Sequence, residues 1–213
     1  MSLKTVFKDI IQHFQHENIQ FALAGGMIAS LYRTEERLTQ DLDFLIFAEP
    51  NTLAVAQNII KHFGLQPNII TKAELEGGPL FAIKRKSTAP YMVVGRSNAA
   101  EMKIGLDFIL PTMPWFAQAL ERSAYNVIDF GFAKIPCLTV EDVIIAKIYA
   151  VNNSPMRFKD LDDLQSIFKA AHDLDFAYLV GELQKYDLKV SSNLKKILPK
   201  ALRSIWRGSK KHK

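Results

Sequence analysis

Apolar residues in the first third of the chain follow two alternating patterns. Helical spacing, as in Ile10, Ile11 and Phe14, alternates with short continuous apolar runs that are typical of buried strands. The pattern predicts helices at 3–16, 27–32 and 53–63, and strands at 21–24, 42–47 and 66–71. We therefore expect this part of the chain to alternate between α and β structure.

The pattern changes near residue 80. Closely spaced apolar runs predict strands that pair antiparallel, followed by a helix and a hairpin turned at Gly131. The strands are expected at 80–84, 91–94 and 102–110, the helix at 114–122 and the hairpin at 127–135. Beyond Pro136 the spacing is helical, with Thr139 as an N-cap and later helices at 158–170, 175–186 and 191–207.

Together these elements predict an α+β fold in two domains. A mixed sheet flanked by helices would occupy residues 1–135, and residues 136–213 would form a C-terminal helical lobe that ends in a basic tail. A chain of 213 residues, 48% of them hydrophobic, is long and apolar enough to bury such a core.

Asp41 and Asp43 stand two residues apart where the strand at 42–47 begins. Side chains alternate along a strand, so the two carboxylates share one face while Leu42 and Phe44 point into the core. Like charges this close repel each other unless a cation lies between them. Carboxylate oxygens suit Mg²⁺, which binds through a few carboxylates, water and substrate phosphates.

Two further features extend this candidate site. The strand at 21–24 ends in Gly25-Gly26 and turns into a helix, a geometry that lets backbone N–H groups approach a phosphate. Asp107 is an isolated acid in an apolar strand, where burial without a partner would be costly. Taken alone, the glycine pair indicates only a tight turn, and Asp-x-Asp only an exposed strand face.

The combination of Gly25-Gly26 with Asp41-x-Asp43 resembles the signature of the polymerase-beta-like nucleotidyltransferase superfamily. Within it, residues 20–170 resemble the AbiEii-like nucleotidyltransferases, the toxins of type IV toxin–antitoxin systems. Two strings carry the closer resemblance: Arg37-x-Thr39-x-Asp41-x-Asp43, and Lys147 followed by Arg157-Phe158-Lys159-Asp160.

The resemblance implies metal-dependent phosphoryl transfer. Asp41, Asp43 and Asp107 would hold Mg²⁺ and carry catalysis, and Asp107 is also assigned as the base for the acceptor hydroxyl. A larger set would serve the nucleotide phosphates and the structure of the site: Gly25, Gly26, Arg37, Thr39, Lys147, Arg157, Lys159 and Asp160.

Residue chemistry leaves alternatives open for the charged members of this set. Lys147 is the sole charge in an apolar helical run, so its tip needs a partner, and a triphosphate or Asp160 would serve equally. Arg37 would bind phosphate or pair with Asp41. Lys159 would bind phosphate or form a salt bridge with an acid one turn later.

The charge distribution bears on the acceptor. Residues 194–213 contain eight basic residues and no acid, whereas the whole chain has 27 basic and 22 acidic residues, so the rest of the chain is mildly acidic. A basic tail on an acidic body favours contact with a polyanion such as RNA. A solvated C-terminal helix explains the same pattern equally well.

Other features narrow the setting. No apolar run approaches the roughly 20 residues that span a bilayer, and the N-terminus lacks a signal-peptide core, so we expect a soluble, cytoplasmic protein without membrane contact. Cys137 is expected to be a buried structural thiol, and no histidines have metal-ligand spacing. No strong self-association signal is visible, which makes a monomer the default expectation.

The sequence therefore predicts a nucleotidyltransferase that moves NMP from an NTP to a hydroxyl acceptor. An RNA acceptor, such as a tRNA 3′ end, would fit a toxin-like role with an antitoxin protein as partner. The alternatives are transfer to an antibiotic or another small molecule, and a non-catalytic protein that binds nucleotide or regulates a partner.

Overall fold

The computed structural model describes residues 2–35, 38–77, 89–96, 104–154, 156–186, 188 and 192–203. The chain divides into two compact units. The sheet unit comprises Met1–Ile28 and Arg37–Thr139, and the helical unit comprises Ala29–Glu36 and Val140–Lys213.

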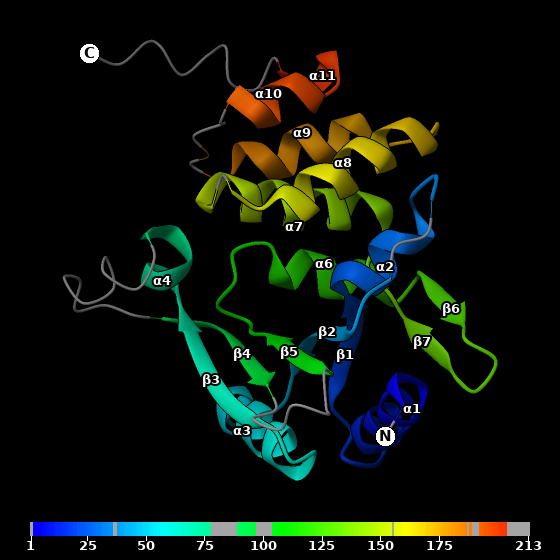
Figure 1. The fold of residues 1–213 in the computed structure, drawn as a ribbon, viewed down its shortest axis with the longest axis vertical. Coiled ribbons are helices and arrows are strands. Elements are labelled where there is room, and N and C mark those ends of the chain that lie inside the picture. Colours follow the sequence, from blue (N-terminus) through cyan, green and yellow to red (C-terminus); the bar gives the residue numbers. More distant parts are fainter. Residues whose placement is uncertain are drawn as a thin grey trace. The chain divides into compact units, whose positions relative to one another are not determined.

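The sheet unit is built on a five-stranded mixed sheet (Figure 1). Its strands are β1 (Gln20–Ala24), β2 (Asp41–Phe47), β3 (Gln66–Thr71), β4 (Pro90–Arg96) and β5 (Gly105–Ile109). The order is β1-β2-β5-β4-β3, with β2 and β5 parallel and the other neighbouring pairs antiparallel. A separate hairpin joins β6 (Val127–Asp129) to β7 (Lys134–Pro136).

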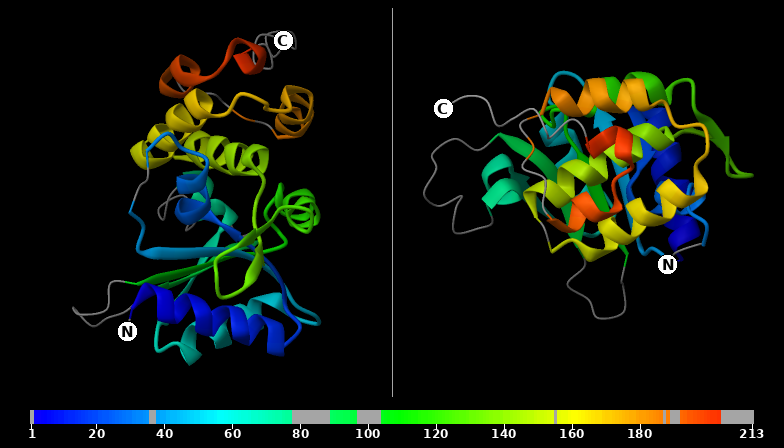
Figure 2. Two further views of the ribbon diagram at one scale, coloured as in Figure 1. Left: turned by 90° about the vertical axis from the view of Figure 1, so that its right-hand side faces the viewer. Right: turned by 90° about the horizontal axis from the view of Figure 1, so that it is seen from above.

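Helices cover both faces of this sheet. As Figures 1 and 2 show, α1 (Leu3–His16) and α3 (Thr52–His62) lie on one face and α6 (Phe116–Ser123) on the other. Under α1 the ring of Phe14 lies with its centroid 5.2 Å from Phe44 and 6.0 Å from Phe108. Burying each such ring stabilises the fold by roughly 1.5–3 kcal/mol, so this aromatic cluster fixes which face of β2 and β5 is core.

The helical unit is a set of short packed helices. These are α7 (Val140–Asn153), α8 (Phe158–Ala170), α9 (Phe176–Gln184), α10 (Ser192–Ile197) and α11 (Lys200–Arg203). α7 packs against both α8 and α9. Asp175 caps the N-terminus of α9, and its carboxylate accepts the N–H of Tyr178 at 2.9 Å. None of the helices that the structure describes is long and apolar enough to cross a membrane.

The structure confirms the expected α+β fold with a mixed sheet flanked by helices. The single helix expected at 191–207 is wrong where the structure describes it, because Pro199 lacks an N–H and separates α10 from α11. Two short helices also differ: α2 (Gly25–Leu31) begins at the glycine pair, and α4 (Lys72–Gly77) was not expected. The strand expected at 80–84 lies outside the described residues.

Candidate active site

The three candidate aspartates lie on adjacent strands of the sheet unit. β2 and β5 run parallel in a register that places Asp43 opposite Asp107 and Asp41 opposite Gly105. Because side chains alternate along a strand, all three acids are on the face opposite to the aromatic cluster under α1. The structure thus places on one face of two adjacent strands the three acids that the sequence singled out.

Two glycines leave the space that these carboxylates fill. A Cβ atom at Gly105 would collide with Oδ1 of Asp41, and a Cβ atom at Gly25 would collide with the carboxylate of Asp43. Gly25 also has a φ of +65°, in the left-handed region that glycine adopts without steric cost. No pattern in the sequence predicts a role for Gly105.

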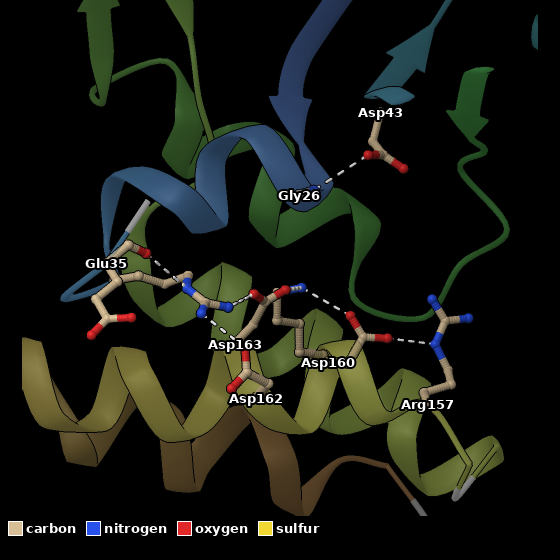
Figure 3. Close-up of polar contacts among 9 residues, drawn as sticks. Gly26, Glu35, Asp43, Arg157, Asp160, Asp162 and Asp163 are labelled. Atoms are coloured by element: carbon tan, nitrogen blue, oxygen red, sulfur yellow. Dashed lines mark hydrogen bonds and ion pairs between the residues drawn. The ribbon is translucent and has the colours of Figure 1, made fainter. Parts of the chain in front are cut away.

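The glycine turn and Thr39 hold the start of β2 in place. The N–H of Gly26 donates to Oδ2 of Asp43 at 3.3 Å (Figure 3), since β1 ends at Ala24, directly opposite Asp43. Oγ1 of Thr39 lies 3.3 Å from both the backbone N and the backbone O of Asp41. Thr39 therefore positions Asp41 through its backbone.

Arg96 is a member of this site that the sequence analysis missed. It is the last residue of β4, and its guanidinium donates to both carboxylate oxygens of Asp107, with Nη2 2.8 Å from Oδ2. These hydrogen bonds raise the pKa of Arg96 against the opposing effect of burial, and Asp41 and Asp43 contribute to the rise. The predicted antiparallel pairing of 91–94 with 102–110 was the signal that could have placed Arg96 near Asp107.

The second predicted cluster forms a buried ion-pair network in the helical unit. On α7, Nζ of Lys147 lies 2.9 Å from Oδ1 of Asp160 and 2.6 Å from Oδ2 of Asp163, both on α8 (Figure 3). Arg157 pairs with Asp160 as well. Burial would raise the pKa of Asp160, but the charges of Lys147 and Arg157 outweigh it and lower the pKa. Of the two partners considered for Lys147, the structure shows the carboxylate.

Arg33 joins this network from a distant part of the sequence. Its Nη2 lies 2.8 Å from Oδ2 of Asp162, and its Nη1 donates to Asp163 (Figure 3). No pattern in the sequence had singled out Arg33. Lys159 is exposed, and the acids one turn after it are bound by Arg33 and Lys147.

The sequence also led to predictions for Arg37 and Cys137. Arg37 lies outside the described residues. Cys137 is fully buried, its thiol donates to the carbonyl of Ile135 at 3.2 Å, and burial raises its pKa to about 12. A thiol held neutral in this way agrees with a structural role.

Residues 9–209 match the family described as nucleotidyl transferase AbiEii toxin, type IV TA system. The chain belongs to the AbiEii nucleotidyltransferase family. No curated protein sequence matches it. Among solved structures, an antigenic nucleotidyltransferase-like protein from Paracoccidioides brasiliensis is similar at 14% identity, over 95% of this chain and 84% of that chain, with a TM-score of 0.48. The lincomycin-bound lincosamide antibiotic adenylyltransferase LnuA is similar at 14% identity, over 80% of this chain and 99% of that chain, with a TM-score of 0.48.

Nucleotidyltransferases of the AbiEii kind generally use divalent metals, and the acids of the sheet unit fit such an ion. Their donors are carboxylate oxygens, which Mg²⁺ prefers, and Gly25 and Gly105 leave them room. Within the described residues, no three Asp, Glu, His or Cys side chains are gathered as a ready metal cage. Asp43 is bonded to Gly26 and Asp107 to Arg96, so a cation would compete with these contacts.

Proposed function

We propose that this AbiEii-family chain transfers NMP from a nucleoside triphosphate to a hydroxyl acceptor, with Mg²⁺ held by Asp41, Asp43 and Asp107. The observation that supports the proposal is the register of β2 and β5, in which the three acids share one face and Gly25 and Gly105 border Asp43 and Asp41. Arg96 supplies one positive charge beside these three negative charges, so the repulsion among the acids is only partly relieved. An incoming cation resolves that repulsion.

The residues of the sheet unit then have distinct roles. Mg²⁺ at the carboxylates would neutralise phosphate charge and polarise the reacting phosphoryl group. Asp41 and Asp43 would hold that ion, and the N–H of Gly26, which donates to Asp43 in this structure, would be a donor for a phosphate oxygen. Asp107 accepts the proton of the acceptor hydroxyl. The hydroxyl oxygen forms the new bond to the α-phosphorus, and pyrophosphate leaves.

In the helical unit, the ion-pair network has a structural role. Two acids on α8 fix the ammonium group of Lys147, and buried pairs of this kind hold their side chains in one geometry. The further assignment to nucleotide phosphates stays a prediction for Arg37, Lys147, Arg157, Lys159 and Asp160.

For the acceptor we favour RNA. The eight basic residues in 194–213 support this choice, and the toxin description of the family supports a toxin role with an antitoxin partner. A small-molecule acceptor would need no basic tail, and it is the second candidate.

The direct test of transfer is incubation of the protein with each α-labelled NTP, Mg²⁺ and total tRNA, followed by gel electrophoresis. Label should enter the RNA with the wild type and be absent with the matched Asp41→Ala/Asp43→Ala variant. Equal labelling by both proteins would exclude the assigned site. Bound NTP without labelled RNA would move the proposal to a small-molecule acceptor.

The tail is best tested by charge rather than by truncation, because Leu194, Leu198 and Leu202 are buried and their removal would damage the core. Lys195, Lys196 and Lys200 are exposed. Their joint replacement by Gln should weaken tRNA binding and reduce its salt dependence. Binding with fewer phosphate contacts releases fewer counterions from the RNA. The matched control replaces three exposed lysines of the sheet unit by Gln: Lys4, Lys61 and Lys72. Equal effects of the two triple variants would exclude the tail as the RNA contact.

A further inference from the structure

Arg96 lies beside the acid cluster. β4 and β5 are antiparallel, so the end of β4 lies beside the start of β5, where Gly105 and Asp107 stand. The guanidinium of Arg96 contacts both oxygens of Asp107 while half of its side chain remains exposed, against 10% for Asp107. The acid is thus covered and its arginine partner faces outward.

Gly105 links Arg96 to a second acid. A Cβ atom at Gly105 would collide both with Oδ1 of Asp41 and with Nη1 of Arg96, so these two groups border the same small space. The charges of Asp41 and Asp43 also act on Arg96. The guanidinium therefore lies where the negative charge of the three acids is concentrated.

Asp107 is buried, so pairing with Arg96 offsets the cost of burying its charge. That structural role does not explain why half of the Arg96 side chain remains exposed beside Asp41, or why the contact engages both oxygens of an acid that the proposed function assigns to a cation. Arginine is also the side chain whose planar fork matches a phosphate as well as it matches a carboxylate. One guanidinium can serve both acids and phosphates at this position.

We propose that Arg96 is a substrate-binding residue of this site, which holds Asp107 until a divalent cation takes that carboxylate and then donates to a phosphate oxygen of the triphosphate. The inference rests on the proposed function. It assigns Arg96 two successive partners, so its removal has two consequences of opposite sign.

Arg96→Gln should bind a divalent cation more tightly in the absence of nucleotide, because the two hydrogen bonds from Arg96 no longer compete for the carboxylate of Asp107. The same variant should bind triphosphate more weakly, because a charged donor to phosphate is lost. Each change is expected to be about tenfold, the size of one charge-assisted hydrogen bond. A purely structural arginine would not change the two affinities in opposite directions.

The experiment is isothermal titration of wild type and Arg96→Gln with Mn²⁺ alone, and separately with inorganic triphosphate in the presence of Mg²⁺. Asp41→Asn identifies the site, since Mn²⁺ binding that depends on Asp41 takes place at the acid cluster. Arg122→Gln is the matched control, because Arg122 donates to the hydroxyl of Thr139 at 3.2 Å and its loss should leave both affinities unchanged.

Tighter Mn²⁺ binding together with weaker triphosphate binding supports the inference. Unchanged affinities, or two affinities that fall together, overturn it while Asp41-dependent Mn²⁺ binding leaves the proposed function standing. Absence of Asp41-dependent binding in the wild type overturns both. Should Arg96→Gln fail to fold, Arg96→Lys keeps the charge without the fork and is expected to shift both affinities in the same two directions by a smaller factor.

Discussion

The sheet unit and the helical unit hold acidic side chains in opposite ways. In the sheet unit, Asp41, Asp43 and Asp107 gather on one face beside glycines that leave them room. In the helical unit, the side chains of Lys147 and Asp163 are 8% and 0% exposed and lie 2.6 Å apart. The first group has an excess of negative charge, and the second is balanced.

The difference distinguishes a binding site from a structural network. Charges taken out of water must find partners within the fold, because an unpaired buried charge is strongly destabilising. In the sheet unit Asp41 and Asp43 are partly exposed and Asp107 is buried against Arg96, so one cation faces three acids, and a cation from outside would relieve the remaining repulsion. Unbalanced charge therefore marks the place where an external ligand is expected.

The largest expected effect follows from removing one acid of the sheet unit. Asp41→Ala and Asp43→Ala should each lower nucleotidyl transfer by about a thousandfold or more, because each loses a ligand of the catalytic ion. The free energy of unfolding should not fall in parallel, since one of three repelling charges is gone. Label transfer and urea unfolding measure the two quantities. A variant that keeps a tenth of the activity contradicts the assignment.

The helical unit should respond in the opposite manner. Asp163→Ala leaves Lys147 and Arg33 short of a buried partner and should lower the free energy of unfolding by about 3–5 kcal/mol. Asp162→Ala is the matched control, because its side chain is 63% exposed and the change should cost less than about 1 kcal/mol. Chemical denaturation measures the free energy of unfolding of both variants. Equal decreases would show that burial does not determine how much these ion pairs contribute to stability.

A smaller effect is expected from filling the space at Gly105. Gly105→Ala forces the carboxylate of Asp41 to move, and a displacement of this kind should slow transfer by about tenfold to a hundredfold. Gly181→Ala is the control, because a Cβ atom there meets nothing within 4 Å. Kinetics of both variants at saturating Mg²⁺ test the comparison, and full activity of Gly105→Ala would mean that the glycine is dispensable.

The smallest effect concerns acid stability. The folded-state pKa of Asp160 is lowered, so its contribution to stability is present above the ordinary pKa of an aspartate, about 3.9, and is lost as pH falls through the lowered value. Asp160→Asn should therefore lose less stability than the wild type between neutral and strongly acidic pH. If the free energy of unfolding falls equally in the two proteins across that pH range, Asp160 makes no such contribution.

Sequence patterns were informative where structure is local. The period-2 alternation predicted that Asp41 and Asp43 share one face of β2, and the strand register agrees. The isolated position of Asp107 in an apolar strand marked it as a candidate site residue, and the structure pairs it with Arg96. Helix spacing likewise predicted α1 and α8 to the residue. These features depend only on neighbours along the chain.

Contacts between distant segments were beyond the same reasoning. Arg33 reaches acids about 130 positions later in the chain, and no spacing rule connects them. Arg96 could have been placed near Asp107 from the antiparallel pairing of their strands, but the length of its side chain leaves its partner open. The importance of Gly105 follows only from the register that sets it opposite Asp41.

The most direct measurement is thermal unfolding with increasing Mn²⁺, comparing the wild type with Asp43→Asn. A cation that binds the folded acid cluster stabilises the native state by RT ln(1 + [Mn²⁺]/Kd), so the unfolding temperature rises with the cation concentration. We predict a rise that grows with Mn²⁺ for the wild type and is absent for Asp43→Asn, whereas equal rises in the two proteins would contradict a metal site at the acids of β2 and β5.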